Sequence, residues 1–207
     1  LIHYAGTKGS LIIEDDFENE FVYLQKPTPS LFGLAGGHNV VYLGSFSRLL
    51  LPSIRISFMV LPPSLADEYH RRADYYSQTA SKAEQIALCQ FIRDGHLGAQ
   101  TRRLKRLYSQ KLKLLLHEVR EVFGSSSQIQ IGAAGTSLAL TLSSPADGAE
   151  LKKQARTRGL RLQILKEEPG FVTLLLSCSS MPEEDFAPAC HLLSQIMSEL
   201  SSPVPKE

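Results

Sequence analysis

Two serines and two arginines follow one short apolar segment and could together hold a phosphate. The sequence GSFSR at 44–48 comes directly after the apolar residues 40–43, and Arg55 follows seven residues later. Hydroxyls donate hydrogen bonds without carrying charge, whereas a guanidinium grips phosphate oxygens with a planar fork. The segment therefore predicts a phosphate site, although Ser45 and Ser47 could equally satisfy backbone groups of a turn.

A carboxylate offers a second functional group. Asp15 follows the apolar segment 11–14, and we expect its position after two isoleucines to bury it. A buried carboxylate needs a cationic or hydrogen-bonding partner. Together with a phosphate site at the carboxyl ends of parallel strands, it would suit a phosphorylated ligand. Asp15 could instead cap a loop, and Arg55 or Arg48 could form a structural ion pair with Asp15 or Asp16.

The elements that must position these groups are short strands and helices. Apolar runs bounded by glycine, serine and proline are typical of buried parallel strands. Residues 1–9 resemble the end of a helix, so we expect the chain to begin in the middle of a fold. The pattern then predicts strands at 11–14, 40–43 and 56–61, a loop at 26–38, and helices at 63–76 and 81–93, the last with Ile86, Cys89 and Phe91 or Ile92 facing inward.

The second half of the chain has a different pattern. Apolar positions recur at three- to five-residue intervals over 97–123, which predicts one long amphipathic helix. This segment carries seven Lys and Arg against two Glu, which we interpret as a solvated face rather than a nucleic-acid contact. Strands are predicted at 128–131, 137–142, 160–165 and 171–176, and helices at 146–158 and 182–200. The organisation predicted is a large α/β domain over 1–96, a connecting helix over 97–123, a small α+β domain over 124–200 and a frayed tail over 201–207.

Composition narrows the classes of protein. The 207 residues are 43% hydrophobic and 21% charged, which excludes a disordered chain. Because 22 Lys and Arg nearly balance 21 Asp and Glu, no overall field points to nucleic acid or a membrane. The three cysteines have no metal-ligand spacing, so we expect no metal and interpret them as reduced, buried thiols of a cytoplasmic protein.

Four sequence blocks identify a family resemblance. They are IIEDDFENEF at 12–21, VVYLGSFSRLLLPSIRISFMVLPP at 40–63, KAEQIALCQFIRDGH at 82–96 and TRRLKRLY at 101–108. In this order they resemble the aminotransferase-like domain of MocR/GabR-type transcriptional regulators, which is related to the fold type I pyridoxal-phosphate enzymes. The resemblance covers nearly the whole chain. It implies the second half of a large α/β domain, with a mainly parallel sheet and helices, followed by a small α+β domain.

The resemblance also implies a cofactor and its binding residues. Asp15 matches the aspartate that pairs with the protonated pyridine nitrogen of pyridoxal 5'-phosphate. Ser45 and Ser47 match hydroxyl positions near the cofactor phosphate, and Arg55 matches the arginine that clamps it.

Three positions depart from the family pattern. Arg48 stands where the family has the lysine that binds the cofactor covalently, and a guanidinium offers no free amine. Phe17 replaces a tyrosine that contacts the cofactor ring oxygen, and Leu175 replaces the arginine that binds a substrate carboxylate. We therefore assign no catalytic residue and expect pyridoxal phosphate to bind weakly and without a covalent bond, or not at all.

The functional expectation is sensing of a small-molecule effector or amino compound rather than turnover. Two alternatives stay open: an active aminotransferase that uses another lysine, such as Lys26 or Lys82, and a decayed structural or dimerisation domain. The resemblance further implies a homodimer in the full-length protein. It implies DNA binding only through an N-terminal winged-helix domain that is absent from this chain, and no membrane partner.

Overall fold

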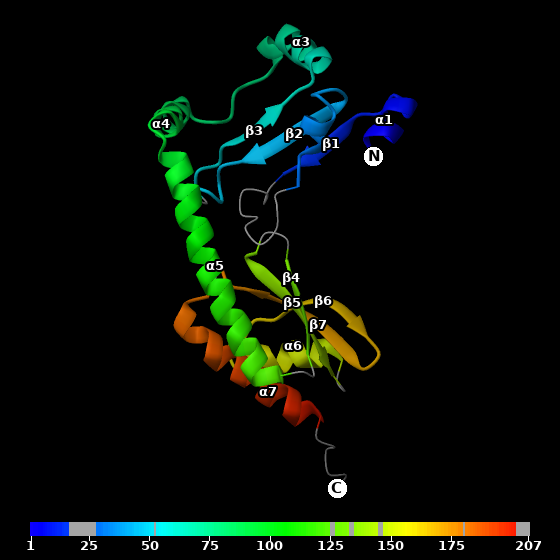
Figure 1. Ribbon diagram of the computed structural model, residues 1–207, viewed down its shortest axis with the longest axis vertical. Helices are drawn as coiled ribbons and strands as arrows, with labels where there is room; N and C mark the ends of the chain where they lie inside the picture. Colours follow the sequence, from blue (N-terminus) through cyan, green and yellow to red (C-terminus); the bar gives the residue numbers. More distant parts are fainter. Residues whose placement is uncertain are drawn as a thin grey trace. The chain divides into compact units, whose positions relative to one another are not determined.

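The computed structural model describes residues 1–16, 28–51, 53–124, 127–132, 135–144, 147–179 and 181–201. Contacts divide the chain into two compact units, unit 1 (Leu1–Leu104) and unit 2 (Lys105–Glu207). The division falls within the long helix α5 (His96–Phe123) (Figure 1). This helix confirms the amphipathic helix predicted over 97–123. Apart from Ser201, the predicted tail lies outside the described residues.

Unit 1 is built around a three-stranded sheet in the order β1-β2-β3 (Figure 1). β1 pairs with β2 in parallel, and β2 pairs with β3 in antiparallel orientation, so β1 and β3 are the edges of the described sheet. The three strands predicted in this unit are confirmed to within two residues at their ends. The helix predicted at 63–76 ends at Arg71, and the loop predicted at 26–38 contains a short helix at Leu31–Leu34. In unit 2, the strand predicted at 160–165 lies at Gln163–Glu168. The elements are α1 (Ile2–Lys8), β1 (Ile12–Asp15), α2 (Leu31–Leu34), β2 (Val40–Ser45), β3 (Ser57–Val60), α3 (Pro63–Arg71), the short η2 (Ala73–Tyr75) and α4 (Lys82–Arg93).

The core of unit 1 lies around the central strand. Val40 and Val41 in β2 are buried, as are Leu49 after β2 and Ile56 before β3. β1 is less covered, because its residues alternate between half-buried and exposed positions. The strand of unit 1 with buried residues therefore forms the centre of its sheet, and the strand that carries Asp15 lies at one edge.

Helix α4 turns Phe91 inward as predicted, but not Ile86 or Cys89. Ile86 and Ile92 are exposed, and so is Cys89, whereas Leu88 and Phe91 are half-buried. The helix turns Leu88 and Phe91 toward the segment that follows β2, where they line a shared apolar groove. Apolar residues surround much of α4, so their spacing alone did not fix which side is covered. The prediction of a buried thiol holds only for Cys178 and Cys190.

Unit 2 contains an antiparallel sheet in the order β4-β5-β7-β6, covered on one face by helices. Leu138, Leu140 and Leu142 of β5 and Val172 and Leu174 of β7 form the buried face, because side chains alternate across a strand. Its elements are α5, β4 (Gln128–Ile131), β5 (Ser137–Ser143), α6 (Gly148–Thr157), β6 (Gln163–Glu168), β7 (Phe171–Ser177), the short η4 (Glu183–Asp185) and α7 (Phe186–Ser201).

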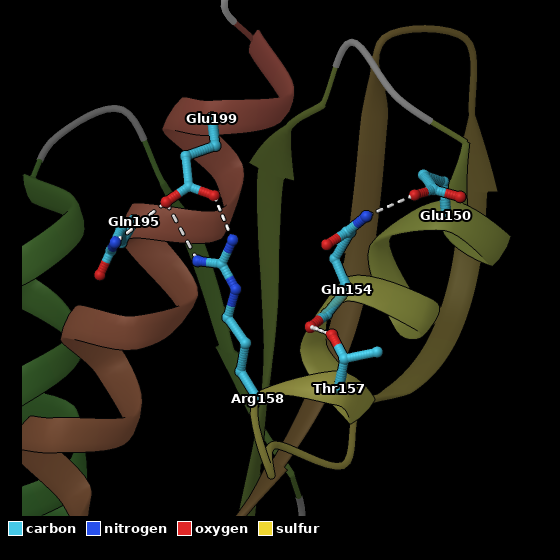
Figure 2. A network of polar contacts seen from close by, with 6 residues as sticks. All are labelled: Glu150, Gln154, Thr157, Arg158, Gln195 and Glu199. Atoms are coloured by element: carbon cyan, nitrogen blue, oxygen red, sulfur yellow. Dashed lines mark hydrogen bonds and ion pairs between the residues drawn. The ribbon is translucent and has the colours of Figure 1, made fainter.

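A polar network joins the end of α6 to α7 (Figure 2). The Arg158 guanidinium donates from Nη1 to Glu199 Oε1 at 3.0 Å, and its Nη2 contacts the other carboxylate oxygen. Gln195 Nε2 also donates to Glu199 Oε1, at 2.9 Å. On α6, Gln154 Nε2 donates to Glu150 Oε1 at 2.7 Å. These contacts hold the two helices that cover the sheet.

The network predicts a pH dependence of unit 2 stability. Hydrogen bonds from Arg158 and then Gln195 hold the pKa of Glu199 below its ordinary value. A carboxyl with a lower pKa in the folded state contributes stability above its unfolded pKa of about 4.3, and loses it as the pH falls through the folded pKa. We expect Glu199→Gln to be less stable than the unchanged chain at pH 6, with the difference shrinking as the pH falls below about 4.3.

Urea denaturation followed by circular dichroism across this pH range measures the difference. Glu121→Gln is the matched control, because Glu121 is exposed on α5 and forms no ion pair within the described residues. A stability difference for Glu199→Gln that stays constant from pH 6 to pH 3 would contradict the role of its charge.

No helix in the described part of the chain is long and apolar enough to cross a membrane. The same residues contain no cluster of three or more His, Cys, Asp or Glu side chains that could hold a metal ion.

Candidate functional site

A hollow of about 880 Å³ lies in unit 1, beside the carboxyl ends of β1 and β2. Asp15, Ser45 and Arg55 all line it, so the structure brings together three of the four predicted cofactor-binding residues. We call it the strand-end hollow. The aromatic ring of Tyr69 and the segment Gln78–Ala80 form further parts of its wall.

The register of the sheet explains why these side chains meet. Asp15 pairs with Leu43 in the parallel pair, and Ser45 lies two residues farther along β2. Residues two apart on a strand share a face, so Asp15 and Ser45 point to the same side of the sheet. Ser45 pairs in turn with Ser57 at the start of β3, two residues after Arg55. A carboxylate, a hydroxyl and a guanidinium are thereby placed along one edge of the hollow.

Asp15 is exposed, not buried as predicted. β1 is an edge strand of the described sheet, and its face that carries Asp15 also leaves Ile13 67% exposed. Two preceding isoleucines were therefore a poor guide to burial. The side chains of Asp15 and Arg55 form no ion pair or hydrogen bond within the described residues, so both are open to a ligand.

The neighbouring Asp16 has a different environment. Its side chain accepts a hydrogen bond of 2.6 Å from the Tyr42 hydroxyl, and Tyr42 is on the sheet face opposite to Ser45. Of the two aspartates, Asp15 is thus the one that shares the hollow with Arg55.

The turn after β2 uses its second serine structurally. Ser47 Oγ donates to the backbone carbonyl of Ile54 at 2.7 Å, and Ser47 N donates to Ser45 Oγ at 3.3 Å. These bonds fit the alternative that the serines satisfy a turn. Arg48 is half-buried in the same turn. The described residues that line the hollow include neither Ser47 nor Arg48, so the turn borders the site and the hollow itself is lined by Asp15, Ser45 and Arg55.

Glu14 makes a structural contact that the sequence did not predict. Its two carboxylate oxygens accept hydrogen bonds from the backbone amides of Leu31 and Phe32, at 2.7 and 2.9 Å. These amides belong to the first turn of α2, where backbone donors have no partner within the helix. Glu14 therefore ties residues 31–34 to β1. Ser30 marks the start of that helix in the sequence, but nothing in the spacing indicated which carboxylate would reach it.

An aromatic cluster supports the sheet behind the site. Gly44 is buried, and the Phe58 ring lies directly over it, since a Cβ built at Gly44 would come within 2.4 Å of the ring. The same ring lies 5.3 Å from Phe46 and 6.2 Å from Tyr42, measured between centroids. A glycine between Leu43 and Ser45 is what allows this close approach.

Arg48 lies in the turn that borders the hollow, and neither the other departing positions nor the two alternative lysines line it within the described residues. Phe17 and Lys26 are outside the described residues. Lys82 begins α4 and is exposed, and it is not among the described residues that line the strand-end hollow. Leu175 lies in β7 of unit 2.

The residues of the strand-end hollow fit pyridoxal phosphate. Arg55 and Ser45 supply a cationic fork and a hydroxyl, the donor types that suit a phosphate. Asp15 supplies an acceptor of opposite charge for a protonated ring nitrogen. The structure shows no covalent partner of the right chemistry within the hollow, because the described residues that line it include no lysine.

Comparison with known proteins identifies homologues among transcription regulators. The HTH-type transcriptional regulator YhdI of Bacillus subtilis is 35% identical over 189 residues, which are 89% of this chain and 40% of that protein. The rhizopine catabolism regulatory protein MocR of Rhizobium meliloti is 31% identical over 168 residues, 81% of this chain and 34% of its own length. The chain thus spans less than half the length of these relatives. No family model matches it.

Solved structures show the fold. LysN, an α-aminoadipate aminotransferase of Thermus thermophilus, superposes with a TM-score of 0.78 at 21% identity, over 98% of this chain and 54% of its own. Homologues of the chain are therefore MocR-type HTH regulators, matched over their aminotransferase-like region, and its fold is that of fold type I aminotransferases.

Proposed function

We propose that this chain is part of the aminotransferase-like domain of a MocR-type transcriptional regulator, and that it binds pyridoxal phosphate as a sensor rather than as a catalyst. The observation that carries the proposal is the gathering of Asp15, Ser45 and Arg55 around one hollow that no described lysine lines. In this proposal residues 1–96 supply the large-domain portion, 97–123 the connecting helix and 124–200 the small domain.

Each side chain has a separate task in the proposed site. Arg55 holds the phosphate with its guanidinium, and Ser45 donates a hydroxyl hydrogen bond to it. Asp15 keeps the ring nitrogen protonated by offering it a negative partner. When bound, pyridoxal phosphate supplies an electron sink for reactions of amino compounds. Arg48 contributes charge beside the site, but its guanidinium stays protonated at neutral pH and can neither bond covalently to an aldehyde nor shuttle a proton.

The properties of the whole protein follow the regulator relatives. DNA binding would come from an N-terminal winged-helix domain, as the HTH names of the relatives suggest. A small-molecule effector or amino compound would be sensed at the strand-end hollow, in a cytoplasmic homodimer. The alternative of an active aminotransferase would need a lysine at the cofactor, and the described residues that line the hollow include none.

Titration of the chain with pyridoxal phosphate tests the proposed site. We expect saturable binding that borohydride does not make covalent, because no amine is aimed at the aldehyde. Removing the Arg55 charge with Arg55→Gln should weaken binding about ten- to a hundredfold, since a charge-assisted hydrogen bond contributes about 1.5–3 kcal/mol. Equilibrium dialysis and absorbance measure the affinity.

Arg93→Gln is the control, because Arg93 is an exposed arginine of α4 that does not line the hollow. Equal affinities for Arg55→Gln and Arg93→Gln would move the phosphate elsewhere. A chain with no saturable binding would favour the decayed structural domain instead. A stoichiometric borohydride-stable adduct on a lysine of the unchanged chain would contradict the sensor proposal.

A further inference from the structure

A second hollow lies in unit 2, and of the described candidate site residues discussed above only Leu175 lines it. It has a volume of about 360 Å³, within the range of small-molecule pockets, and its wall is mostly apolar. We call it the unit 2 hollow. Its apolar wall includes Leu115 of α5, Leu160 and Leu162 before β6, and Phe186 and Leu193 of α7.

The sheet register explains why this hollow is open. β6 begins at Gln163, which pairs with Leu175 of β7. Beyond that point Leu176 and Ser177 pair only with β5 in the described part of the sheet. Side chains of α7 and the part of β7 that β6 does not cover line the same hollow. Both Leu176 and Ser177 line it.

The wall of the hollow is held in place by a lysine behind it. Lys111 Nζ donates to the Met181 carbonyl at 2.7 Å and lies 5.7 Å from the centroid of the Phe186 ring. Met181 and Phe186 both line the hollow. Cys190 completes the apolar lining, because burial and then the charge of Glu118 raise the pKa of its thiol to about 11 and keep it neutral at pH 7.

The charge on the hollow has one sign. Lys152 and Arg161 line it and are exposed, whereas the described lining contains no carboxylate. The adjacent Lys153 pairs with Glu150, but neither Lys152 nor Arg161 forms an ion pair within the described residues. An apolar wall with two uncompensated cations at its edge favours a ligand that combines an apolar body with an anionic end.

We propose that the unit 2 hollow binds a small monocarboxylate with an apolar chain, with the chain against Leu115, Phe186 and Leu193 and the carboxylate between Lys152 and Arg161. The apolar wall disfavours a strongly hydrated anion such as free phosphate, and the cations disfavour an amine. The proposal is independent of pyridoxal phosphate, because every residue of this hollow lies in unit 2 and the strand-end hollow lies in unit 1.

Calorimetric titration of the 207-residue chain with octanoate tests the proposal, with octanol and octylamine as uncharged and cationic probes. We expect saturable octanoate binding at one site, at least about tenfold tighter than binding of either other probe. Lys152→Glu and Arg161→Glu should each weaken octanoate about tenfold or more. Lys153→Glu should not, because Lys153 is on the same helix but does not line the hollow. Excess pyridoxal phosphate should not displace octanoate.

A filling variant tests the apolar part separately. Ala189→Phe places a ring in the hollow from α7, and should abolish octanoate binding in a chain whose circular dichroism is unchanged. Equal binding of octanol and octanoate, or equal effects of Lys152→Glu and Lys153→Glu, would overturn the carboxylate assignment. Absence of saturable binding, or displacement by pyridoxal phosphate, would overturn the site. Failure here leaves the Arg55→Gln result unaffected, so the two proposals are tested separately.

Discussion

Arg48→Lys should give this chain a covalent bond to pyridoxal phosphate that the unchanged chain lacks. Lysine has an ordinary pKa near 10.4 and provides a free amine in the small fraction that attacks an aldehyde, whereas a guanidinium does not. The backbone of residue 48 is fixed by the Ser47–Ile54 hydrogen bond in the turn that follows Ser45, so a lysine there would begin beside the site. Borohydride treatment followed by peptide mass spectrometry should find one phosphopyridoxyl group, on residue 48.

The covalent bond should appear without transaminase activity. The family resemblance puts Leu175 at the position of the arginine that binds a substrate carboxylate, so we expect an amino donor to lack that anchor. Arg93→Lys is the matched control for nonspecific labelling, because Arg93 is exposed on α4. If Arg48→Lys is labelled no more than Arg93→Lys while the unchanged chain binds pyridoxal phosphate, the turn does not aim residue 48 at the cofactor. If the unchanged chain does not bind it, the binding proposal itself is wrong.

Gly44→Val should destabilise unit 1 by about 1–3 kcal/mol, which is the usual effect of overpacking. A Cβ at residue 44 would come within 2.4 Å of the Phe58 ring, and Phe46 and Tyr42 flank that ring. The ring would have to leave its place over the strand. Urea denaturation of Gly44→Val, of Phe58→Ala and of the double variant that combines them measures the free energy of unfolding.

The sign of the effect should reverse when the ring is absent. In a Phe58→Ala background the space above residue 44 is open, and valine is a better strand residue than glycine. Gly44→Val should then stabilise the chain relative to Phe58→Ala alone. The same destabilisation in both backgrounds would show that the close approach of Phe58 is not the reason for the glycine. Pyridoxal phosphate affinity, measured on the folded variants, reports whether the neighbouring Ser45 has moved.

Much of the architecture could be predicted from local sequence. The apolar run at 40–43 gave a buried central strand, and the three- to four-residue spacing of Leu112, Leu115 and Val119 gave a helix whose inward side chains are buried. The helical spacing fits one element only, whereas the short apolar run indicates a strand through its β-branched residues and the glycine that follows it. The family motif also brought Asp15, Ser45 and Arg55 to one hollow, although they are up to forty residues apart.

The properties that failed depend on contacts between distant segments. Burial of Asp15 depends on what covers β1, and two preceding isoleucines carry no information about that. The inward side of α4 depends on where the segment after β2 packs, because apolar residues surround the helix. Glu14 was missed because its partners, the amides of Leu31 and Phe32, are backbone groups that any sequence would provide. The charge and hydrogen-bonding capacity of a side chain follow from its residue type. Its burial and the backbone amides that it binds depend on segments far away in the sequence.

The two outer strands of the unit 1 sheet have a consequence for handling the molecule. In the described residues β1 and β3 each leave one side of their backbone without a strand partner, and Phe58, Met59 and Val60 on β3 are all exposed. The unpaired backbone groups of such an edge strand can form hydrogen bonds with an extended segment of another chain. Purified protein should therefore be kept dilute, because self-association through these edges increases with protein concentration.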